Sequence, residues 1–245
     1  SEADATLALV PVPAKEADQF GIVDCDAESR VVGFREKPKD VDPAGPDLVG
    51  NMGVYLFKTE ALVQAISRDA RLEESRHDFG HNVLPDMVAR GARVIGHVFR
   101  SAGETAEPYW RDIGTRDAFY EANMDLVSVS PRFNLYDRSW PVRTTAIQAP
   151  PAKFVFAGGE QERIGQALDS ILGPHVRVNS WARVEHSILM DEVEVGRHAE
   201  VRRAIVDKHV KIPPDTKIGV DLDEDRKRFT VTTGGIVIVP RGERF

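Results

Sequence analysis

The sequence predicts an α/β domain followed by a parallel β-helix, and two observations support this fold class. Short apolar runs alternate with amphipathic stretches over roughly the first half of the chain, which is typical of a sandwich of helices on a mainly parallel or mixed sheet. The last part carries a repeat. Aliphatic residues recur there every seventeen positions, in three ladders: Val176, Val193 and Val210; Val178, Val195 and Ile212; and Val184, Val201 and Ile218.

The repeat has a second spacing that predicts its geometry. Within each turn of the repeat the aliphatic positions lie six residues apart, as at 178 and 184. One inward-facing aliphatic residue in every six is typical of one face of a triangular prism. Three such faces make one coil, and successive coils stack because their strands pair in parallel. Three coincident ladders favour this β-helix over an ordinary antiparallel sheet with chance spacing. Residues 229–232 and 235–239 read as closing strands.

The α/β part divides into strands and helices by its periodicity. Apolar or alternating runs predict strands at residues 6–12, 19–24, 30–34, 49–57 and 92–99, with a turn at 26–29. Residues 59–66 predict a helix with Leu62, Val63 and Ile66 on one side. A second helix follows residues 77–80, and Gly80 disfavours helix at its start. Thr115 can cap a third helix at residues 117–126.

Composition limits the class of protein. The chain has 245 residues, a formal net charge of −7 and 42% hydrophobic residues, enough for one large or two ordinary domains. An acidic balance argues against nucleic acid as the main partner. No apolar run is long enough for a membrane span. The single cysteine, Cys25, forms no intrachain disulfide, and a reducing cytoplasm fits this usage best.

The pattern dissolves between residues 128 and 153, where four prolines fall: Pro131, Pro141, Pro150 and Pro151. This predicts an interdomain connection. Leu135, Tyr136 and Trp140 suggest that the connection packs on something.

Seven segments occur in the order of one family. They are Phe20-Gly21-Ile22, Glu36-Lys37-Pro38, Asn51-Met52-Gly53-Val54-Tyr55, His77-Asp78-Phe79-Gly80, Tyr109-Trp110-Arg111-Asp112-Ile113-Gly114-Thr115, Asp137-Arg138-Ser139-Trp140-Pro141-Val142-Arg143-Thr144 and Pro151-Ala152-Lys153-Phe154. The chain resembles the bacterial ADP-glucose pyrophosphorylases (glucose-1-phosphate adenylyltransferases) over essentially its whole length. The Tyr-Trp-Arg-Asp and Trp-Pro-Val-Arg-Thr segments are the specific ones.

The resemblance implies a fold and its limits. It implies the C-terminal part of a Rossmann-like nucleotidyltransferase domain at residues 1–130, a linker at 131–155, and a left-handed parallel β-helix for regulation and oligomerisation at 156–245. The family's Gly-rich nucleotide loop has no counterpart in the sequence, and about 150 residues are expected to precede this stretch in a complete enzyme. A non-catalytic scaffold or regulatory fragment is therefore an alternative, as is a pyrophosphorylase for another sugar or nucleotide.

The implied reaction is ATP plus glucose 1-phosphate giving ADP-glucose and pyrophosphate, for glycogen or α-glucan synthesis. The resemblance implies that Lys37 supplies a cation to the sugar phosphate and that Gly21 offers backbone approach. It further implies a sugar pocket lined by Glu36, Asn51, Tyr55, Asp78, Phe79 and Trp110. Asn51 stands where relatives often carry serine. Taken alone, Tyr55 and Phe79 also suit a plain core, and Lys37 suits the surface.

Asp112 is the implied ligand of Mg²⁺, which usually takes one or two carboxylates plus phosphates. By spacing alone Asp112 is equally a solvated loop acid. Lys208 and Arg241 match basic contacts to allosteric metabolites, against the alternative of a solvated charged face. The family resemblance also implies a homotetramer.

Histidines raise two further alternatives. His77 and His81 are four apart, a spacing that can bind zinc from a helix, but no further ligand pair supports it. Left-handed β-helices also occur in acyltransferases that use a histidine base. Four histidines fall in this region without identifying such a site: His175, His186, His198 and His209.

Overall fold

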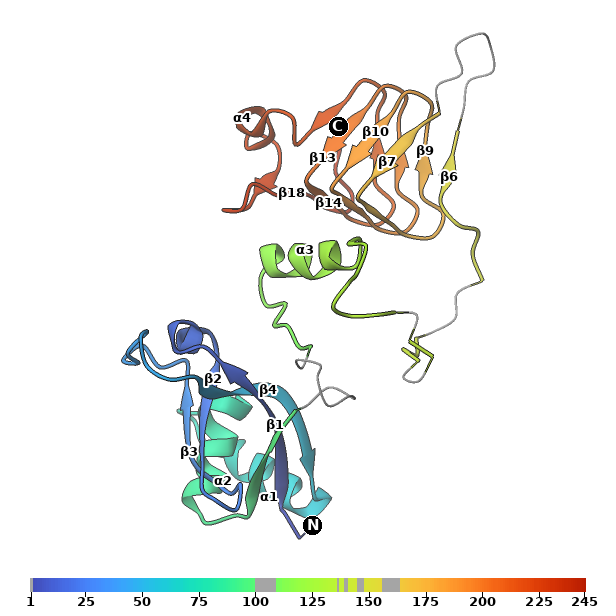
Figure 1. Ribbon diagram of the computed structural model, residues 1–245. Coiled ribbons are helices and arrows are strands. Elements are labelled where there is room, and N and C mark those ends of the chain that lie inside the picture. Colours follow the sequence, from blue (N-terminus) through green and yellow to red (C-terminus); the bar gives the residue numbers. More distant parts are fainter. Residues whose placement is uncertain (1, 100–108, 136, 139–140, 145–147, 156–163) are drawn as a thin grey trace. The chain divides into compact units, whose positions relative to one another are not determined.

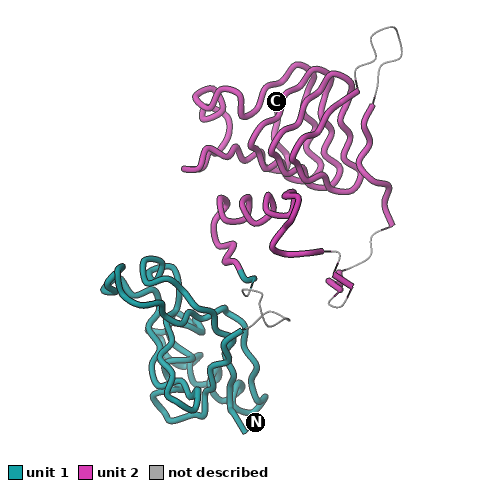
Figure 2. The backbone as a smooth tube through the Cα atoms, in the orientation of Figure 1, with its two compact units in different colours: residues 1–110 teal, residues 111–245 magenta. Residues whose placement is uncertain are grey.

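The computed structural model describes residues 2–99, 109–135, 137–138, 141–144, 148–155 and 164–245. These residues form two compact units, residues 1–110 and 111–245 (Figure 2). The predicted packing of Tyr136 and Trp140 lies outside the described residues. No described helix is long and apolar enough to cross a membrane. The division of the chain by role, at residues 1–130, 131–155 and 156–245, stays a prediction.

The first unit is built on one five-stranded sheet in the order β3-β2-β4-β1-β5 (Figure 1). Its strands are β1 Ala5–Val12, β2 Gly21–Cys25, β3 Val31–Glu36, β4 Leu48–Phe57 and β5 Val94–Val98. β1 pairs in parallel with β5, whereas the β1–β4, β2–β3 and β2–β4 pairs are antiparallel. The sheet is therefore mixed, one of the two forms predicted, and all five predicted strands are confirmed.

Two helices pack against this sheet, and one expectation about them was wrong. They are α1 Thr59–Asp69 and α2 Leu84–Ala89, which share a core with Leu7 and Leu9 of β1. On α1 the packed residues are Ala61 and Ala65, while Val63 and Ile66 are 50% and 41% exposed. The predicted apolar face is thus turned away from the core, because the small alanine side chains are the ones that pack against it.

Two short helical segments complete the first unit. Residues Ala14–Gln19 form a 3-10 helix, η1. Residues Phe79–Val83 form a single π-helical turn, η2, which continues into α2. Gly80 lies inside η2, so the expectation that Gly80 disfavours helix there was wrong. Asp78 caps this turn, since its side chain accepts a hydrogen bond from the amide of His81, and that bond supplies a partner for one free N–H group.

The second unit contains the predicted β-helix, in which three parallel sheets form the sides of a prism (Figure 1). Residues seventeen apart pair directly, as Val184 does with Val201 and Val195 with Val178. All nine ladder residues are at most 3% exposed. The strands are β6 Lys153–Phe154, β7 Gln166–Leu168, β8 Ile171–Leu172, β9 Arg177–Val178, β10 Arg183–Glu185, β11 Ile188–Leu189, β12 Glu194–Val195, β13 Glu200–Arg202, β14 Ala204–Val206, β15 Lys211–Ile212 and β16 Lys217–Ile218.

The corners of the prism have a backbone conformation of their own. Nine non-glycine residues there have φ between 43° and 69°, again in three ladders seventeen residues apart: Asp169, His186 and Arg203; His175, Glu192 and His209; and Trp181, His198 and Asp215. Left-handed φ is uncommon outside glycine, and aspartate and histidine adopt it several times more readily than most residues. The corner geometry thus explains why histidines recur in this region.

The remaining elements close one end of the β-helix and lie along its side. β17 Thr230–Val231 and β18 Val237–Val239 are the predicted closing strands, and β18 continues the sheet beside β14. A short helix, α4 Leu222–Asp225, precedes them. Helix α3, Arg116–Asp125, packs against the β-helix through Tyr120 and Phe119 (Figure 1). Its predicted cap is confirmed, because Thr115 Oγ1 accepts a hydrogen bond from the amide of Ala118 at 3.1 Å.

Candidate functional site

Glu36 stands at the centre of the predicted sugar-side residues. It is the last residue of β3 and pairs with Gly21, the first residue of β2. A β-carbon placed on Gly21 would lie 2.6 Å from Glu36 Oε2, and one placed on Gly80 would lie 2.5 Å from the same oxygen. Both glycines therefore leave room for this carboxylate, which is held at the mouth of the β2–β3 pair beside the η2 turn.

A phenol and an amide from β4 lie on the same side. Asn51 Nδ2 donates to the hydroxyl of Tyr55 at 2.7 Å, and Asn51 Oδ1 accepts from the amide of Gly53 at 3.1 Å. Burial raises the pKa of Tyr55, the hydrogen bond from Asn51 lowers it, and the charges of Glu36 and Asp78 raise it further. Tyr55 therefore stays protonated and can donate a hydrogen bond at neutral pH.

Aromatic rings form the floor of this region. The ring centroid of Phe79 lies 5.6 Å from that of Tyr55 and 5.8 Å from that of Phe57. These separations are typical of favourable aromatic pairs. Phe79 is 37% exposed, so part of its ring is available to pack on the C–H groups of a ligand, as the sugar-pocket assignment requires.

Asp78 precedes Phe79 and lies close to the glycine cradle, the space beside Gly21 and Gly80 that the Glu36 carboxylate fills. Its Oδ1 accepts from the backbone amide of His81 at 2.8 Å and lies 3.2 Å from His81 Nδ1. The amide hydrogen bond from His81 is the largest cause holding the pKa of Asp78 below its usual range. Asp78 is thus ionised at neutral pH and, together with Glu36, presents a second acceptor for hydroxyl groups.

Lys37 follows Glu36 with an unusual backbone. Its φ is 48°, and its amide donates to the carbonyl oxygen of Phe20 at 3.0 Å. Left-handed φ in a non-glycine residue carries a conformational cost, which at Lys37 falls in the turn that follows β3. The side chain of Lys37 is exposed. A cavity of about 410 Å³ lies along the next residues of this loop, between Pro38, Lys39 and the η1 helix.

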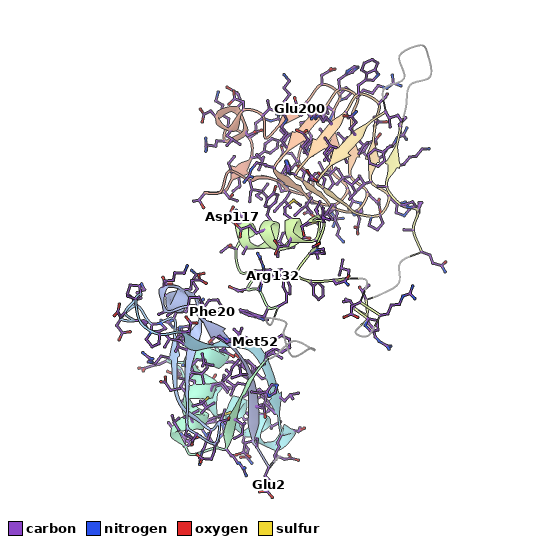
Figure 3. The ribbon with its side chains drawn as sticks, viewed as in Figure 1. Glu2, Phe20, Met52, Asp117, Arg132 and Glu200 are labelled. Carbon is purple, nitrogen blue, oxygen red and sulfur yellow. The ribbon has the colours of Figure 1, made fainter. Side chains whose placement is uncertain are left out.

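Trp110 packs beside the same corner. Its ring centroid lies 5.7 Å from that of Phe20, at an interplanar angle of 53°, and Figure 3 labels Phe20 at this end of the first unit. The structure therefore brings together Gly21, Glu36, Asn51, Tyr55, Asp78 and Phe79, with Lys37 and Trp110 linked to them through Phe20. Sequence reasoning assigned no role to Phe20 or Gly80, although both occur within the motifs that carried the resemblance.

Asp112 belongs to the second unit. It is exposed, and its Oδ1 accepts from the amide of Gly114 at 3.1 Å. The preceding residue, Arg111, forms an ion pair of 2.5 Å with Asp125. Among the described residues no three His, Cys, Asp or Glu side chains gather into a metal site. Asp112 is therefore a single, solvent-facing carboxylate, as is suited to a cation that binds mainly through phosphates.

The two predicted effector contacts lie on the β-helix. Lys208 Nζ forms an ion pair with Asp191 Oδ2 at 3.0 Å, one coil away. Arg241 is exposed and makes no ion pair within the part of the chain that the structure describes. Lys208 thus has a partly exposed carboxylate beside it, a weak interaction in solvent, and the role of both residues as effector contacts stays a prediction.

The histidines serve structural roles at the positions described. His77, at φ 55°, places Nδ1 2.8 Å from Asp69 Oδ2, and Ser75 Oγ donates to the other oxygen of Asp69 at 2.6 Å. These contacts, the Ser75 hydrogen bond first, lower the pKa of Asp69. In the β-helix His198 stacks on Trp181 and His209 pairs with Glu192. All four histidines of the β-helix occupy left-handed corners: His175, His186, His198 and His209.

Comparisons with known proteins agree with this arrangement. A family model described as nucleotidyl transferase matches residues 1–129, and one described as GlmU-like, C-terminal hexapeptide matches residues 163–239. The second match agrees with a left-handed β-helix.

Curated relatives are similar over almost the whole chain. A glucose-1-phosphate adenylyltransferase of Anaeromyxobacter sp. (strain Fw109-5) is 46% identical over 99% of this chain and 65% of the relative. Those of Koribacter versatilis (strain Ellin345) and Deinococcus deserti are 46% and 45% identical over 98% and 100% of this chain, and 62% and 65% of the relatives. The chain thus spans less than two thirds of their length.

Proposed function

Because the chain belongs to the nucleotidyl transferase family, we propose that the complete protein transfers an adenylyl group from ATP to glucose 1-phosphate. The products are ADP-glucose and pyrophosphate, for glycogen or α-glucan synthesis. The observation that carries this proposal is the similarity to glucose-1-phosphate adenylyltransferases over 98–100% of the chain. The cluster around Glu36 supports it, since it offers what a sugar needs: charged acceptors, a phenolic donor and an aromatic surface.

The reaction needs alignment and charge neutralisation more than covalent help from the protein. A phosphate oxygen of glucose 1-phosphate attacks the α-phosphorus of ATP in line. The bond from that phosphorus to the oxygen bridging to the β-phosphate breaks, and pyrophosphate leaves with the bonding pair. Lys37 neutralises charge on the sugar phosphate, and Gly21 lets that phosphate approach the backbone.

The sugar is held by the residues around the glycine cradle. Glu36 and Asp78 accept hydrogen bonds from its hydroxyl groups, Tyr55 donates one, and Asn51 keeps the phenol of Tyr55 oriented. Phe79 packs on one apolar face of the ring, and Trp110 forms a wall of the pocket with Phe20 behind it. Asparagine at position 51 fulfils through its amide the role that serine has in many relatives, because the amide both donates and accepts.

Asp112 is the residue of this chain that would hold Mg²⁺. Nucleotidyl transferases use a divalent ion, and Mg²⁺ favours carboxylate and phosphate oxygens. An exposed carboxylate with Oδ1 fixed by the Gly114 amide fits such a ligand. When bound, the ion would supply charge neutralisation on the phosphates of ATP.

Regulation, assembly and location complete the proposal. Allosteric metabolites with anionic groups bind near Lys208 and Arg241. The β-helix supports a homotetramer, since the exposed Leu168 and Phe154 on its sides favour burial against another copy. The protein works in the cytoplasm, where a lone cysteine such as Cys25 stays reduced.

The test is an assay of the complete protein with ATP, Mg²⁺ and glucose 1-phosphate, following pyrophosphate and ADP-glucose. Lys37→Ala and Asp112→Ala should each lower the rate at least about tenfold, an effect typical of lost transition-state contacts. Glu121→Ala, which removes an exposed carboxylate from α3, is the control. Other nucleoside triphosphates and sugar phosphates are assayed in the same way. Faster turnover of any of them than of ATP and glucose 1-phosphate would refute the assignment of substrates.

A further inference from the structure

The loop that carries Asp112 is folded onto helix α3. Arg111 pairs with Asp125 at the far end of that helix at 2.5 Å. Asp112 Oδ1 accepts from Gly114 N at 3.1 Å, and Thr115 caps the helix through Ala118 N. Two of these contacts tie the loop to α3, and the third, from Gly114 to Asp112, fixes the loop internally. We therefore expect Asp112 to follow the first turn of α3.

The first turn of α3 is fastened to the end of the β-helix. Asp117 Oδ1 accepts from Thr232 Oγ1 at 2.6 Å, and Thr233 Oγ1 makes a longer contact of 3.5 Å with Oδ2. A β-carbon on Gly234 would lie 2.6 Å from Asp117 Oδ1, so this glycine makes room for the carboxylate. Thr232 Oγ1 in turn accepts from Ile236 N at 3.1 Å. The turn between β17 and β18 therefore receives both oxygens of Asp117, which Figure 3 labels on α3.

A second attachment lies one turn further along α3. The hydroxyl of Tyr120 donates to the carbonyl oxygen of His186 at 2.6 Å, and the guanidinium of Arg203 lies 5.8 Å from the Tyr120 ring centre. Tyr120 is 5% exposed and packs with Ile188, Ile205 and Ile236. Tyr120, Phe119 and Met124 thus pack α3 on the prism, and the Asp117 contact is a separate attachment at the first turn of the helix.

We propose that Asp117 is a positioning residue for the metal site. Through its contacts with the turn at Thr232–Gly234, it lets the β-helix fix the position of Asp112. This inference rests on the proposed role of Asp112 as a ligand of Mg²⁺. The carboxylate of Asp117 contacts neither substrate nor metal, and it acts only through the α3 first turn and the Asp112 loop. The β-helix is thereby a part of the metal site's support as well as the place where effectors bind.

The first experiment measures the Mg²⁺ dependence of ADP-glucose formation in the complete protein. Asp117→Ala should raise the Mg²⁺ concentration for half-maximal rate about tenfold, as loss of a group that orients a ligand does, while kcat at saturating Mg²⁺ stays within about twofold. Asp117→Asn keeps an acceptor for Thr232 and should restore most of the Mg²⁺ affinity. Glu121→Ala, on the exposed side of the same helix, should leave it unchanged. Equal Mg²⁺ dependence in Asp117→Ala and Glu121→Ala would overturn the proposal.

The second experiment needs no catalysis. Hydrogen exchange is measured on this chain for Asp117→Ala and for the milder variant Thr232→Val. In both variants the amides of Gly114 and Ala118 should exchange faster than in the wild type. The amides of Ile188 and Ile205 should exchange at an unchanged rate. Unchanged exchange at Gly114, or equal acceleration throughout the β-helix, would contradict the positioning role. If the complete wild-type protein makes no ADP-glucose, the proposed function fails, and the exchange pattern alone then decides whether Asp117 holds the Asp112 loop.

Discussion

The carboxylate of Glu36 occupies the space that a side chain on Gly80 would need, since a β-carbon there would lie 2.5 Å from Oε2. Gly80 has a helical backbone within η2, where alanine is otherwise preferred to glycine by about 1 kcal/mol. Glycine at this position therefore leaves Glu36 its present side-chain conformation, and a β-carbon there would make the carboxylate shift.

A substitution cycle tests this relationship. Gly80→Ala should raise KM for glucose 1-phosphate in the complete protein, because the added methyl group displaces Glu36. In a Glu36→Ala background the same change should instead stabilise the first unit by up to about 1 kcal/mol, measured by urea unfolding. Additive effects of the two substitutions would contradict a direct steric coupling.

Tyr55 and Asn51 provide a second prediction. Tyr55→Phe removes a 2.7 Å hydrogen bond from a half-buried pair and should lower the free energy of unfolding by about 0.5–1.5 kcal/mol. The measurement is chemical denaturation followed by circular dichroism. Asn51→Ser should cost less than Asn51→Ala, because the hydroxyl of serine retains a donor. An equal loss for both variants would show that the hydrogen bond contributes nothing.

The β-helix core offers a matched pair of isoleucines. Ile218 is fully buried in a ladder, whereas Ile164 is 50% exposed. Ile218→Ala should destabilise the second unit by about 2–5 kcal/mol through lost burial and a residual cavity, and Ile164→Ala should cost far less. Thermal unfolding of both variants gives the comparison, and similar losses would mean that Ile218 does not lie in the packed interior.

Backbone strain at the corners predicts the behaviour of a histidine. His198 has φ 60°, so His198→Val should cost about 1–2 kcal/mol beyond the loss of its stacking on Trp181. His198→Gly should be clearly less destabilising than His198→Val, because glycine adopts this conformation freely. Calorimetric unfolding distinguishes the two. If the valine variant is as stable as the glycine variant, the corner is not held in the left-handed region.

Asp225 predicts a pH dependence. It is 4% exposed and accepts from Gly219 N at 2.8 Å, and burial is the main cause that raises its pKa. The folded state therefore binds the proton of Asp225 more tightly than the unfolded state does. Its contribution to stability falls as the pH rises from its ordinary value near 3.8 through the raised pKa. Asp225→Asn keeps an acceptor and should flatten this slope in urea titrations between pH 4 and 7. An unchanged slope would exclude Asp225 as its source.

The sequence alone was sufficient for the strands and for α1, α2 and α3, but not for η1, η2 and α4. The site residues that the family resemblance implied stay predictions. Period-two and period-six patterns located the strands of both units, and Thr115 marked the start of α3. The packed face of α1 was missed because hydrophobicity ranks Val63 and Ile66 above Ala61 and Ala65, while the space available at the interface favours the smaller pair. The hydrophobic pattern of a single helix gives no information on how closely that helix approaches the sheet.

Two features of the site depend on contacts between distant segments. That the carboxylate of Glu36 needs glycine at both 21 and 80 follows only once β2, β3 and η2 are side by side. The link from Asp117 to Thr232 likewise joins residues that no periodicity connects. By contrast, the corner histidines did carry a readable signal: each lies at a position that recurs every seventeen residues in the coil, as His175 does with Glu192 and His209, and histidine tolerates left-handed φ.

The seventeen-residue coil also limits how the second unit can change in length. Between β7 and β16 one added or lost residue within a coil would put the later ladder positions and left-handed corners out of step. Removal of residues 193–209 would instead join Glu192 directly to Val210, with the ladders and corners in step. At the two ends of the β-helix, by contrast, β6 pairs with β9 and β14 pairs with β18 at spacings other than seventeen residues, as Phe154 with Val178 and Ile205 with Ile238 show. Between β7 and β16, where the seventeen-residue spacing is unbroken, length variation is therefore expected in whole coils, which makes the number of coils the natural variable for engineering its reach.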